Sequence, residues 1–266
     1  MNKKVLILLA GIIVVIAGVV GVTQLTGNHQ SKDETITKGT FTVGLEGTYA
    51  PFSYHDDSGK LVGYEVDMAK DIADKLGLKV KFVQTKWDSL IAGINSNRYD
   101  AVINNIGIRP DREKNYRMST PYLYSNSVLI KRTDETDLKS LDDIKGKTMA
   151  QSLTSNYGQV AQQKGADIKA VAGIVEAMNL ITTNRADGSL NDQGAFAAWK
   201  KANPNADVTT VNISKDIKSV PTGVLMNKKD EQLQKDVNKA IKELKKDGTL
   251  TKLSKKYFGV DLSHEQ

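Results

Sequence analysis

The stretch NNIGIRPDREKNYRMSTPYLY, residues 104–124, shows most directly how this chain folds. The apolar residues that lead into it and continue through Ile106 and Ile108 form a run too short for a buried helix, which is typical of a buried parallel strand. Pro110 would end this strand, and Asp111 suits the first turn of a helix. The stretch therefore predicts a strand followed directly by a helix, as in α/β proteins.

Arg112 is the first candidate for a binding residue. It would stand where the carboxyl end of the strand meets the start of the helix, which is where open α/β sheets bind small anions. Its planar guanidinium suits a carboxylate, because it can donate two parallel charge-assisted hydrogen bonds. Spacing alone favours the plainer interpretation, a solvated arginine on a helix face, so the rest of the chain has to decide.

Length and composition limit what the chain can be. With 266 residues, it is long enough for two modest cores, so two lobes are expected. The formal net charge of +6 is spread over interleaved Lys, Asp and Glu, without the basic run that predicts nucleic-acid binding. There is no cysteine, and the histidines His29, His55 and His264 lie far apart. These counts exclude disulfides and thiolate metal sites, and they predict neither a zinc site nor a cofactor.

The N-terminus is predicted to direct export. Lys3 and Lys4 precede residues 5–22, which contain only Val, Leu, Ile, Ala and Gly and are about long enough to span a bilayer. No convincing cleavage site follows, and lipid attachment would need a cysteine. We therefore expect residues 1–27 to be a signal or anchor segment, kept as a membrane anchor in preference to being cleaved. Residues 28–38 would tether an extracytoplasmic domain to it, at the cell surface or, after cleavage, secreted.

Alternating strand and helix patterns follow the tether. Residues 40–45 alternate as a strand, and residues 63–84 predict a helix and a second strand. Asp88 is expected to cap the next helix. Trp87, directly before that cap, is either a core residue or the wall of a pocket at the strand end.

Similar patterns continue beyond residue 140. The hydroxyl-rich segment 152–157 lies between a predicted strand and a helix, and either Thr154 or Ser155 can cap that helix, whose free amides would accept an anion. Asp192 follows a later predicted strand and precedes the predicted helix 193–202. A carboxylate there is well placed for an ammonium group, although helix capping explains it as well.

Two polar crossings, near Lys131 and Ser219, indicate a paired hinge. On this basis we expect lobe 1 to comprise residues 39–130 and 221–266, and lobe 2 to comprise residues 131–220. Lobe 2 would then be an insertion in lobe 1.

Several motifs occur in an order that is specific when they are taken together. They are GLEGTYAPFSY (44–54), GKLVGYEVDMAKDIADKLG (59–77), WDSLIAGINSNRYDAVINN (87–105), IRPDREKNYRMSTPY (108–122) and KDGTLTKLSKKYFG (246–259). With these motifs the chain resembles, from Thr40 to its end, the extracytoplasmic solute-binding proteins of bacterial ABC importers for polar amino acids. The Trp87–Asp88 and Asn104–Asn105 pairs and QSLTSNYG (151–158) are most similar to cystine-binding members.

The resemblance implies the two-lobed fold of periplasmic binding proteins (type II), in which each lobe is a mixed sheet flanked by helices and two strands form the hinge. It also implies that Arg112 holds the α-carboxylate of an amino acid and Asp192 its α-ammonium. The remaining contacts would come from Glu46, Tyr49, Phe52, Trp87, Asn104, Asn105, the backbone of Gly107, and Thr154 or Ser155. Many members have a serine where this chain has Gly107, so no side-chain contact is implied at that position.

The implied function is to bind a free amino acid, L-cystine in first place, and to deliver it to a permease by closing around it. Glutamine, cysteine and histidine are alternative ligands. An enzyme on this fold, such as a dehydratase, is disfavoured because only Glu46 and Asp192 could serve as general acid or base. An adhesion or sensing module is the other alternative. A monomer is expected.

Overall fold

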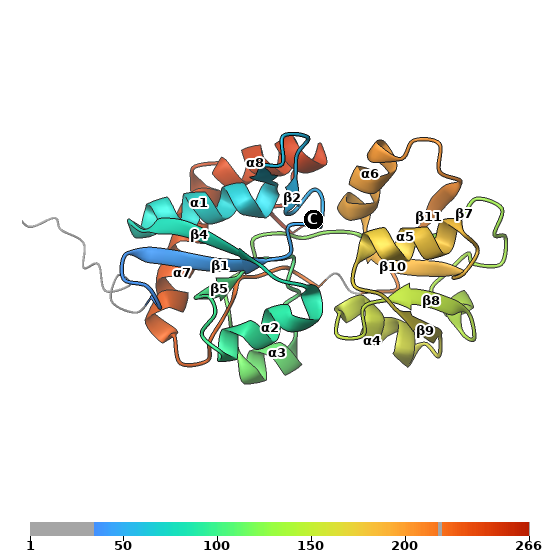
Figure 1. Ribbon diagram of the computed structural model, residues 1–266, viewed down its shortest axis with the longest axis horizontal. Coiled ribbons are helices and arrows are strands. Elements are labelled where there is room, and N and C mark those ends of the chain that lie inside the picture. Colours follow the sequence, from blue (N-terminus) through green and yellow to red (C-terminus); the bar gives the residue numbers. More distant parts are fainter. Residues whose placement is uncertain (1–34, 218–219, 266) are drawn as a thin grey trace, which may run out of the picture. The chain divides into compact units, whose positions relative to one another are not determined.

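Two five-stranded sheets organise the chain in the computed structural model, which describes residues 35–217 and 220–265 (Figure 1). The strand order of the first sheet is β4 (Lys79–Gln84), β1 (Thr40–Leu45), β5 (Ala101–Val102), β12 (Leu225–Met226) and β6 (Arg117–Met118). The order of the second is β11 (Val208–Asn212), β7 (Ser127–Arg132), β10 (Gly188–Asp192), β8 (Thr148–Gln151) and β9 (Asp167–Ala170). A short antiparallel pair, β2 (Tyr54–His55) and β3 (Leu61–Val62), completes the strands of these residues.

The first sheet is mixed and is covered on both faces. Strand β1 pairs in parallel with β4 and β5, whereas β12 runs antiparallel to β5 and β6. The helices around this sheet are α1 (Tyr64–Leu76), α2 (Trp87–Asn95), α3 (Pro110–Asn115), α7 (Glu231–Lys246) and α8 (Thr249–Phe258). In Figure 1, α1 and α8 lie on one side of the sheet, and α2 and α3 lie on the other. Five of the six β1 residues are buried as a result, including residues on both faces of the strand.

The second sheet is also mixed. Strand β7 pairs antiparallel with β10 and β11, and β8 pairs in parallel with β9 and β10. Its helices are α4 (Asn156–Gln163), α5 (Ile174–Thr182) and α6 (Gln193–Ala202), and a short 3₁₀ helix, Asp142–Ile144, precedes β8. The expectation of mixed sheets flanked by helices is thus confirmed.

The chain crosses between the sheets twice. The first crossing joins β6 to β7 and the second joins β11 to β12. The two crossings touch each other, because Leu123 and Thr222 form an isolated antiparallel bridge. The lobe boundary expected at residues 130 and 131 falls inside β7, whose pairing in the second sheet begins at Ser127. The lobe limits themselves stay predictions, and Ser219 lies outside the described residues.

Two local predictions from the sequence were wrong. The strand expected to run to Ile108 ends at Val102, because Asn105 adopts a left-handed backbone (φ 48°) and Gly107 instead bridges to Thr222. Asp88 does not cap α2, which begins at Trp87 without a side-chain cap; Asp88 lies in its first turn, where a negative charge is still favourable.

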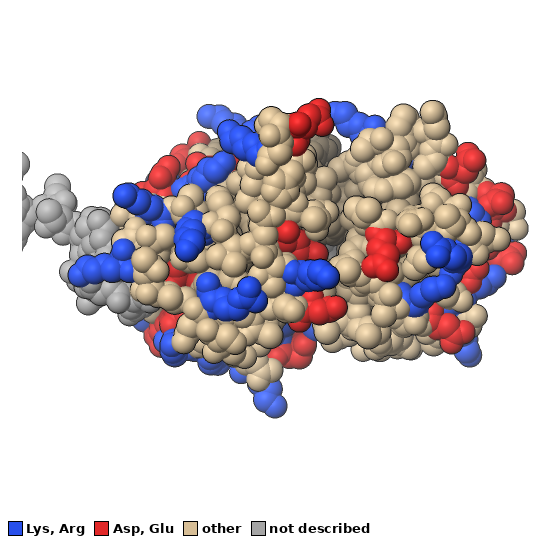
Figure 2. Space-filling model, viewed as in Figure 1, with Lys and Arg blue, Asp and Glu red and all other residues tan. Residues whose placement is uncertain are grey.

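The predicted signal or anchor segment, residues 1–27, and nearly all of the tether, residues 28–38, lie outside the described residues. Within the described part, no helix is both long enough and apolar enough to span a membrane. Positive and negative side chains are interleaved over the face shown in Figure 2, as the mixed composition predicts.

Candidate functional site

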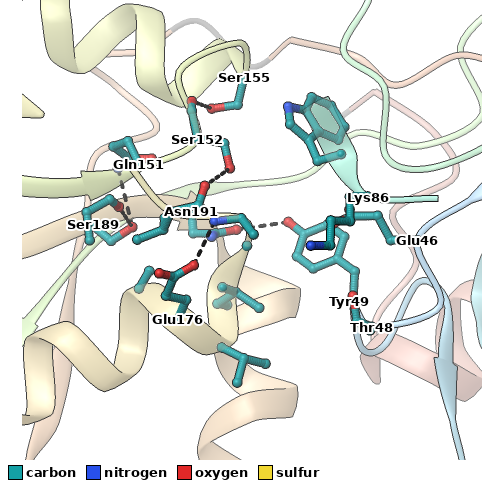
Figure 3. A pocket seen from close by; sticks show the side chains of 18 of the residues that line it. Glu46, Thr48, Tyr49, Lys86, Gln151, Ser152, Ser155, Glu176, Ser189 and Asn191 are labelled. Carbon is teal, nitrogen blue, oxygen red and sulfur yellow. Dashed lines mark hydrogen bonds between the residues drawn. The ribbon is translucent and has the colours of Figure 1, made fainter. Parts of the chain in front are cut away.

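A cavity of about 620 Å³ lies between side chains that come from both sheets. On the side of the first sheet, the residues that line it follow β1, β4 and β5, and on the other side they follow β8 and β9 or belong to the end of β10. Figure 3 shows Glu46 and Tyr49 facing Gln151, Ser189 and Glu176. Binding at the carboxyl ends of strands is the general rule for open α/β sheets, so the topology itself places this site.

Arg112 is a buried cation on the side of the first sheet. It belongs to α3, is 4% exposed, and donates from Nη1 to the Gly107 carbonyl at 2.9 Å. Its Nη2 donates across the site to the Thr154 carbonyl at 3.5 Å, and its guanidinium carbon lies 5.8 Å from the ring centroid of Trp87. No carboxylate lies within ion-pair distance of it among residues 35–217 and 220–265. Burial lowers the pKa of Arg112 to about 10, so the side chain remains a cation at neutral pH. A guanidinium has five N–H donors, so donors remain for an anion.

Asp192 is a buried anion on the side of the second sheet. It ends β10 and is the N-cap of α6, with Oδ1 accepting from the Gly194 amide at 2.8 Å. Oδ2 faces the first sheet and accepts from the Asn105 side chain at 3.4 Å. Burial raises the pKa of this carboxyl, although its hydrogen bonds oppose that rise. Of the two roles that the sequence left open, capping is therefore confirmed, while the second oxygen remains directed at the site.

Glu46 is a second carboxylate at the cavity wall. Its Oε2 accepts from Nδ2 of the Asn104 side chain at 2.7 Å, and its backbone amide donates to Oδ1 of the same side chain at 2.8 Å. Oε1 has no hydrogen-bond partner in the described part of the chain, and it points towards Gly173 at the start of α5, 3.8 Å from where a Cβ would stand. Burial raises the pKa of Glu46 to about 7. An ammonium group in the cavity would compensate this poorly solvated charge.

At the hydroxyl-rich start of α4, the side chains of Ser155 and Thr154 have different hydrogen-bond partners. Ser155 is the N-cap, since its Oγ accepts from the Gly158 amide at 2.9 Å. The Thr154 hydroxyl instead accepts from Trp87 Nε1 at 2.8 Å and donates to Asp88 Oδ1 at 3.3 Å. Trp87 is both a core residue, 9% exposed, and part of the cavity wall, so its two interpretations hold together.

Tyr49 closes the cavity from the first sheet. Its hydroxyl donates to Asn191 Oδ1 at 2.9 Å, and this bond crosses the site in Figure 3. Its ring stacks on Phe52, with centroids 4.9 Å apart and an interplanar angle of 24°. Phe52 itself is fully buried, so it supports Tyr49 from behind instead of facing the cavity.

The structure distributes the expected site residues over three places. Those that line the large cavity are Glu46, Tyr49, Trp87, Asn104, Asn105 and Ser155. A small pocket of about 20 Å³ is lined by Asn105, Gly107 and Asp192, among others. Phe52, Arg112 and Thr154 line neither, although Arg112 and Thr154 touch each other and Trp87.

Sequence reasoning missed a third part of the wall. Val171, Gly173 and Glu176 lie where β9 ends and α5 begins, and all three line the cavity. The signal was present, because a strand end followed directly by a helix is the pattern that identified Asp192. No group of three or more His, Asp or Glu side chains suited to a metal occurs among the described residues.

Comparisons with known proteins agree on a family. Residues 41–260 match the model of the bacterial extracellular solute-binding proteins, family 3. The chain is 45% identical over 227 residues to the L-cystine-binding protein TcyA of Bacillus subtilis (strain 168), covering 85% of this chain and 84% of that protein.

Two solved structures show the same fold. An ancestral arginine-binding protein bound to glutamine superposes with a TM-score of 0.79 at 35% identity, over 84% of this chain and 99% of that one. The L-cystine solute receptor of Neisseria gonorrhoeae, in the unliganded open conformation, gives 0.60 at 44% identity, over 90% and 100%. The expected fold of periplasmic binding proteins (type II) is confirmed. This chain is a member of family 3 of the bacterial extracellular solute-binding proteins and therefore a non-enzymatic component of transport.

Proposed function

We propose that this protein binds a free amino acid, L-cystine in first place, and delivers it to the permease of an ABC importer. The observation that carries the proposal is a pair of buried opposite charges, Arg112 and Asp192, which belong to different sheets. Each is largely removed from water, and neither forms an ion pair within the described residues. The α-carboxylate and α-ammonium of one amino acid would compensate both, and this supports a zwitterionic ligand.

A second positive group on the ligand is supported by Glu46. Because its Oε1 has no partner in the described residues, it can accept from an ammonium at the far end of a long ligand. L-Cystine carries two ammonium groups, and the cavity of about 620 Å³ has room for both halves. Glutamine, cysteine and histidine, which were alternatives from the sequence, would leave the Glu46 charge less well compensated. The name of the TcyA relative supports cystine independently.

Closure of the two lobes around the ligand is the proposed signal to the permease. Taking lobe 1 as residues 39–130 and 221–266 and lobe 2 as residues 131–220, the side-chain bonds that cross the site include Tyr49 to Asn191, Trp87 to Thr154 and Asn105 to Asp192. All three would break if the lobes separated. The TM-score with the open L-cystine receptor is lower than that with the glutamine-bound arginine-binding protein, although the open receptor has the higher sequence identity. This difference supports a closed arrangement of this chain. A ligand that binds both lobes stabilises this arrangement over the open one.

A thermal-shift panel tests the ligand. The purified protein is heated with L-cystine, L-cysteine, L-glutamine, L-histidine or L-arginine, and a ligand present at 100 times its Kd stabilises the folded protein by about 2.7 kcal/mol. We expect L-cystine to give the largest rise in Tm, about 5 to 11 °C for a chain of this size. A larger rise with another amino acid, together with none for L-cystine, would refute the assignment.

Glu46→Gln is the matched variant for the far end of the ligand. It keeps the bond from Asn104 and removes the charge, so we expect it to reduce the Tm rise with L-cystine far more than the rise with L-glutamine. An equal reduction for both amino acids would mean that Glu46 does not contact a second ammonium group.

Retention at the membrane by residues 5–22 and a monomeric state complete the proposal, and the apolar composition of that segment supports the first of these. Fractionation of cells that express the full chain tests it. The protein should stay with the membrane fraction in high salt and leave it in detergent, whereas release into the medium would indicate cleavage.

A further inference from the structure

Glu65 is a buried carboxyl under the floor of the site, and the proposed function does not use it. It is the second residue of α1 and is fully buried. Its Oε1 accepts two hydrogen bonds, one from the Asn105 backbone amide at 2.5 Å and one from the Tyr122 hydroxyl. A carboxyl is seldom buried without a specific role, because its removal from water is unfavourable.

The first of these bonds fixes a residue that reaches across the site. Asn105 has a left-handed backbone, with φ of 48°, which is an uncommon conformation for a residue other than glycine. Its Oδ1 accepts from the Thr222 hydroxyl at 2.8 Å on the second crossing, and its Nδ2 donates to Asp192 Oδ2 at 3.4 Å. By accepting from the Asn105 amide, Glu65 holds the peptide that aims this side chain at Asp192. It therefore acts on the proposed ammonium-binding carboxylate through one intermediate residue.

The second oxygen of Glu65 gives this support an additional property. Oε2 is buried and has no hydrogen-bond partner among the described residues, while Oε1 takes both donors. A proton can therefore be added to Oε2, or removed from it, without breaking either bond to Oε1. Glu65 can change its charge while Asn105 and Tyr122 stay in place.

The surroundings of Glu65 make a change of charge accessible at neutral pH. The titratable groups that face it are Tyr64 on its own helix, Tyr122 ahead of β7, Asp192 at the end of β10 and Glu46 after β1. Burial is the main cause that raises the pKa of Glu65 to about 7, and the negative charges of Asp192 and Glu46 add to it. An ammonium group bound at Asp192 opposes those negative charges, so it favours the ionised form of Glu65.

We propose that Glu65 positions Asp192 for the ligand through Asn105, and that it releases its proton to solvent when the ligand's ammonium group enters. This inference rests on the proposed function for the place of the ammonium group. The O–H bond at Oε2 breaks, the carboxylate keeps the electron pair, and the proton passes to buffer. Ligand affinity consequently rises as the pH approaches 7 from below, and it levels off above that.

Isothermal titration with L-cystine measures the proton directly. The full chain is titrated near pH 6.5 in phosphate and in imidazole, whose different heats of ionisation yield the number of protons released. Glu65→Gln keeps an oxygen that accepts from Asn105 and Tyr122 and cannot ionise. We expect it to release fewer protons than wild type, by roughly 0.3 or more, and to bind about threefold more weakly than wild type near pH 8, because it lacks the charge that favours the ammonium group. Glu243→Gln on α7, away from the cavity, is the matched control and should release as many protons as wild type.

Glu65→Ala tests the positioning role, because it removes the acceptor for the Asn105 amide. We expect about tenfold weaker binding near pH 8, and Glu65→Gln should restore most of the loss. If Glu65→Ala does not fold, proton release by Glu65→Gln decides alone. Equal proton release by Glu65→Gln and wild type, or a folded Glu65→Ala that binds as tightly as wild type, would overturn the inference.

A measurement without ligand separates this inference from the proposed function. A carboxyl whose folded pKa is raised loses stability as the pH rises from its ordinary value to about 7, so Glu65→Gln should gain in Tm over wild type between about pH 5 and pH 8. If this gain is absent, the inference fails whatever the ligand is. If it is present but L-cystine gives no binding heat, the ligand assignment fails, and the titration with the most stabilising amino acid of the panel decides on proton release.

Discussion

Arg112 and Asp192 are the two buried charges proposed to bind the ligand, and the protein holds them in different ways. Asp192 ends a strand that is paired on both sides and caps the following helix with one of its oxygens. Arg112 lies in a helix of six residues, ten positions after the end of β5. Its guanidinium is held by carbonyl oxygens, of which that of Thr154 belongs to the opposite side of the site.

This difference indicates which side of the site has its binding geometry before the ligand binds. The position of Asp192 is part of the fold, because the capping bond lies within one sheet and its helix. The bond from Arg112 to Thr154 forms only when the two sides are together. We infer that the Asp192 side is preorganised, whereas the Arg112 side is completed by closure.

The largest effect is expected from Arg112→Ala. It removes the donors proposed for the α-carboxylate, so affinity for L-cystine should fall at least about 30-fold. Stability should change little, because the variant also relieves an unpaired buried charge. Calorimetry and a thermal melt without ligand measure the two quantities. Binding within threefold of wild type would mean that Arg112 does not bind the ligand, and the comparison of Arg112 with Asp192 would then not apply to the site.

A smaller loss, about tenfold, is expected for Asp192→Asn. The amide keeps an oxygen for the Gly194 amide, so the helix cap remains while the charge is lost. Asp192→Ala should lose about the same affinity and, in addition, about 1 kcal/mol of stability with the cap. If the two variants differ in stability but not in affinity, then the capping role and the proposed ligand-binding role of Asp192 are separate. Asp192→Asn binding as tightly as wild type would place the ammonium group elsewhere.

The parts of the fold that depend on local pattern were predictable. Residues 40–45 and 193–202 form a strand and a helix as expected, because alternation and helical spacing report directly on burial. The expected strand through Ile108 failed because its apolar residues are buried by a bend and by the bridge from Gly107 to Thr222, which lies far away in sequence. Apolar content signals burial but does not identify the structure that causes it.

The site was only partly predictable, because many of its contacts join residues that are far apart in the sequence. The capping roles of Asp192 and Ser155 could be predicted because strand ends and helix starts are visible in sequence. The bond from Trp87 to Thr154 joins residues 67 positions apart, so no local pattern could show that the Thr154 hydroxyl is engaged. Phe52 was expected to face the ligand, yet it lies behind Tyr49, since sequence spacing does not tell which of two stacked aromatic rings is nearer the cavity.

Trp87→Phe tests how much closure contributes on the Arg112 side. It keeps an aromatic ring near the guanidinium but removes the Nε1 donor to Thr154, so the closed form loses a bond and the open form does not. We expect about fivefold weaker binding, consistent with about 1 kcal/mol for one hydrogen bond. Calorimetry measures the affinity, and Tyr49→Phe, which removes the bond to Asn191, is the parallel variant. If neither changes affinity, closure does not depend on these bonds.

The smallest change in affinity is expected for Ser155→Ala, which removes a helix cap on the preorganised side without removing a charge. The Ser155 hydroxyl already accepts from the Gly158 amide and donates to the Ser152 carbonyl at 2.8 Å, so little capacity is left for a ligand. Stability should fall by about 1 kcal/mol, while affinity should stay within about twofold of wild type. A thermal melt and calorimetry on the same preparation measure both. Tenfold weaker binding at an unchanged Tm would mean that this hydroxyl turns to the ligand on binding, and the second-sheet side would then also be completed by the ligand.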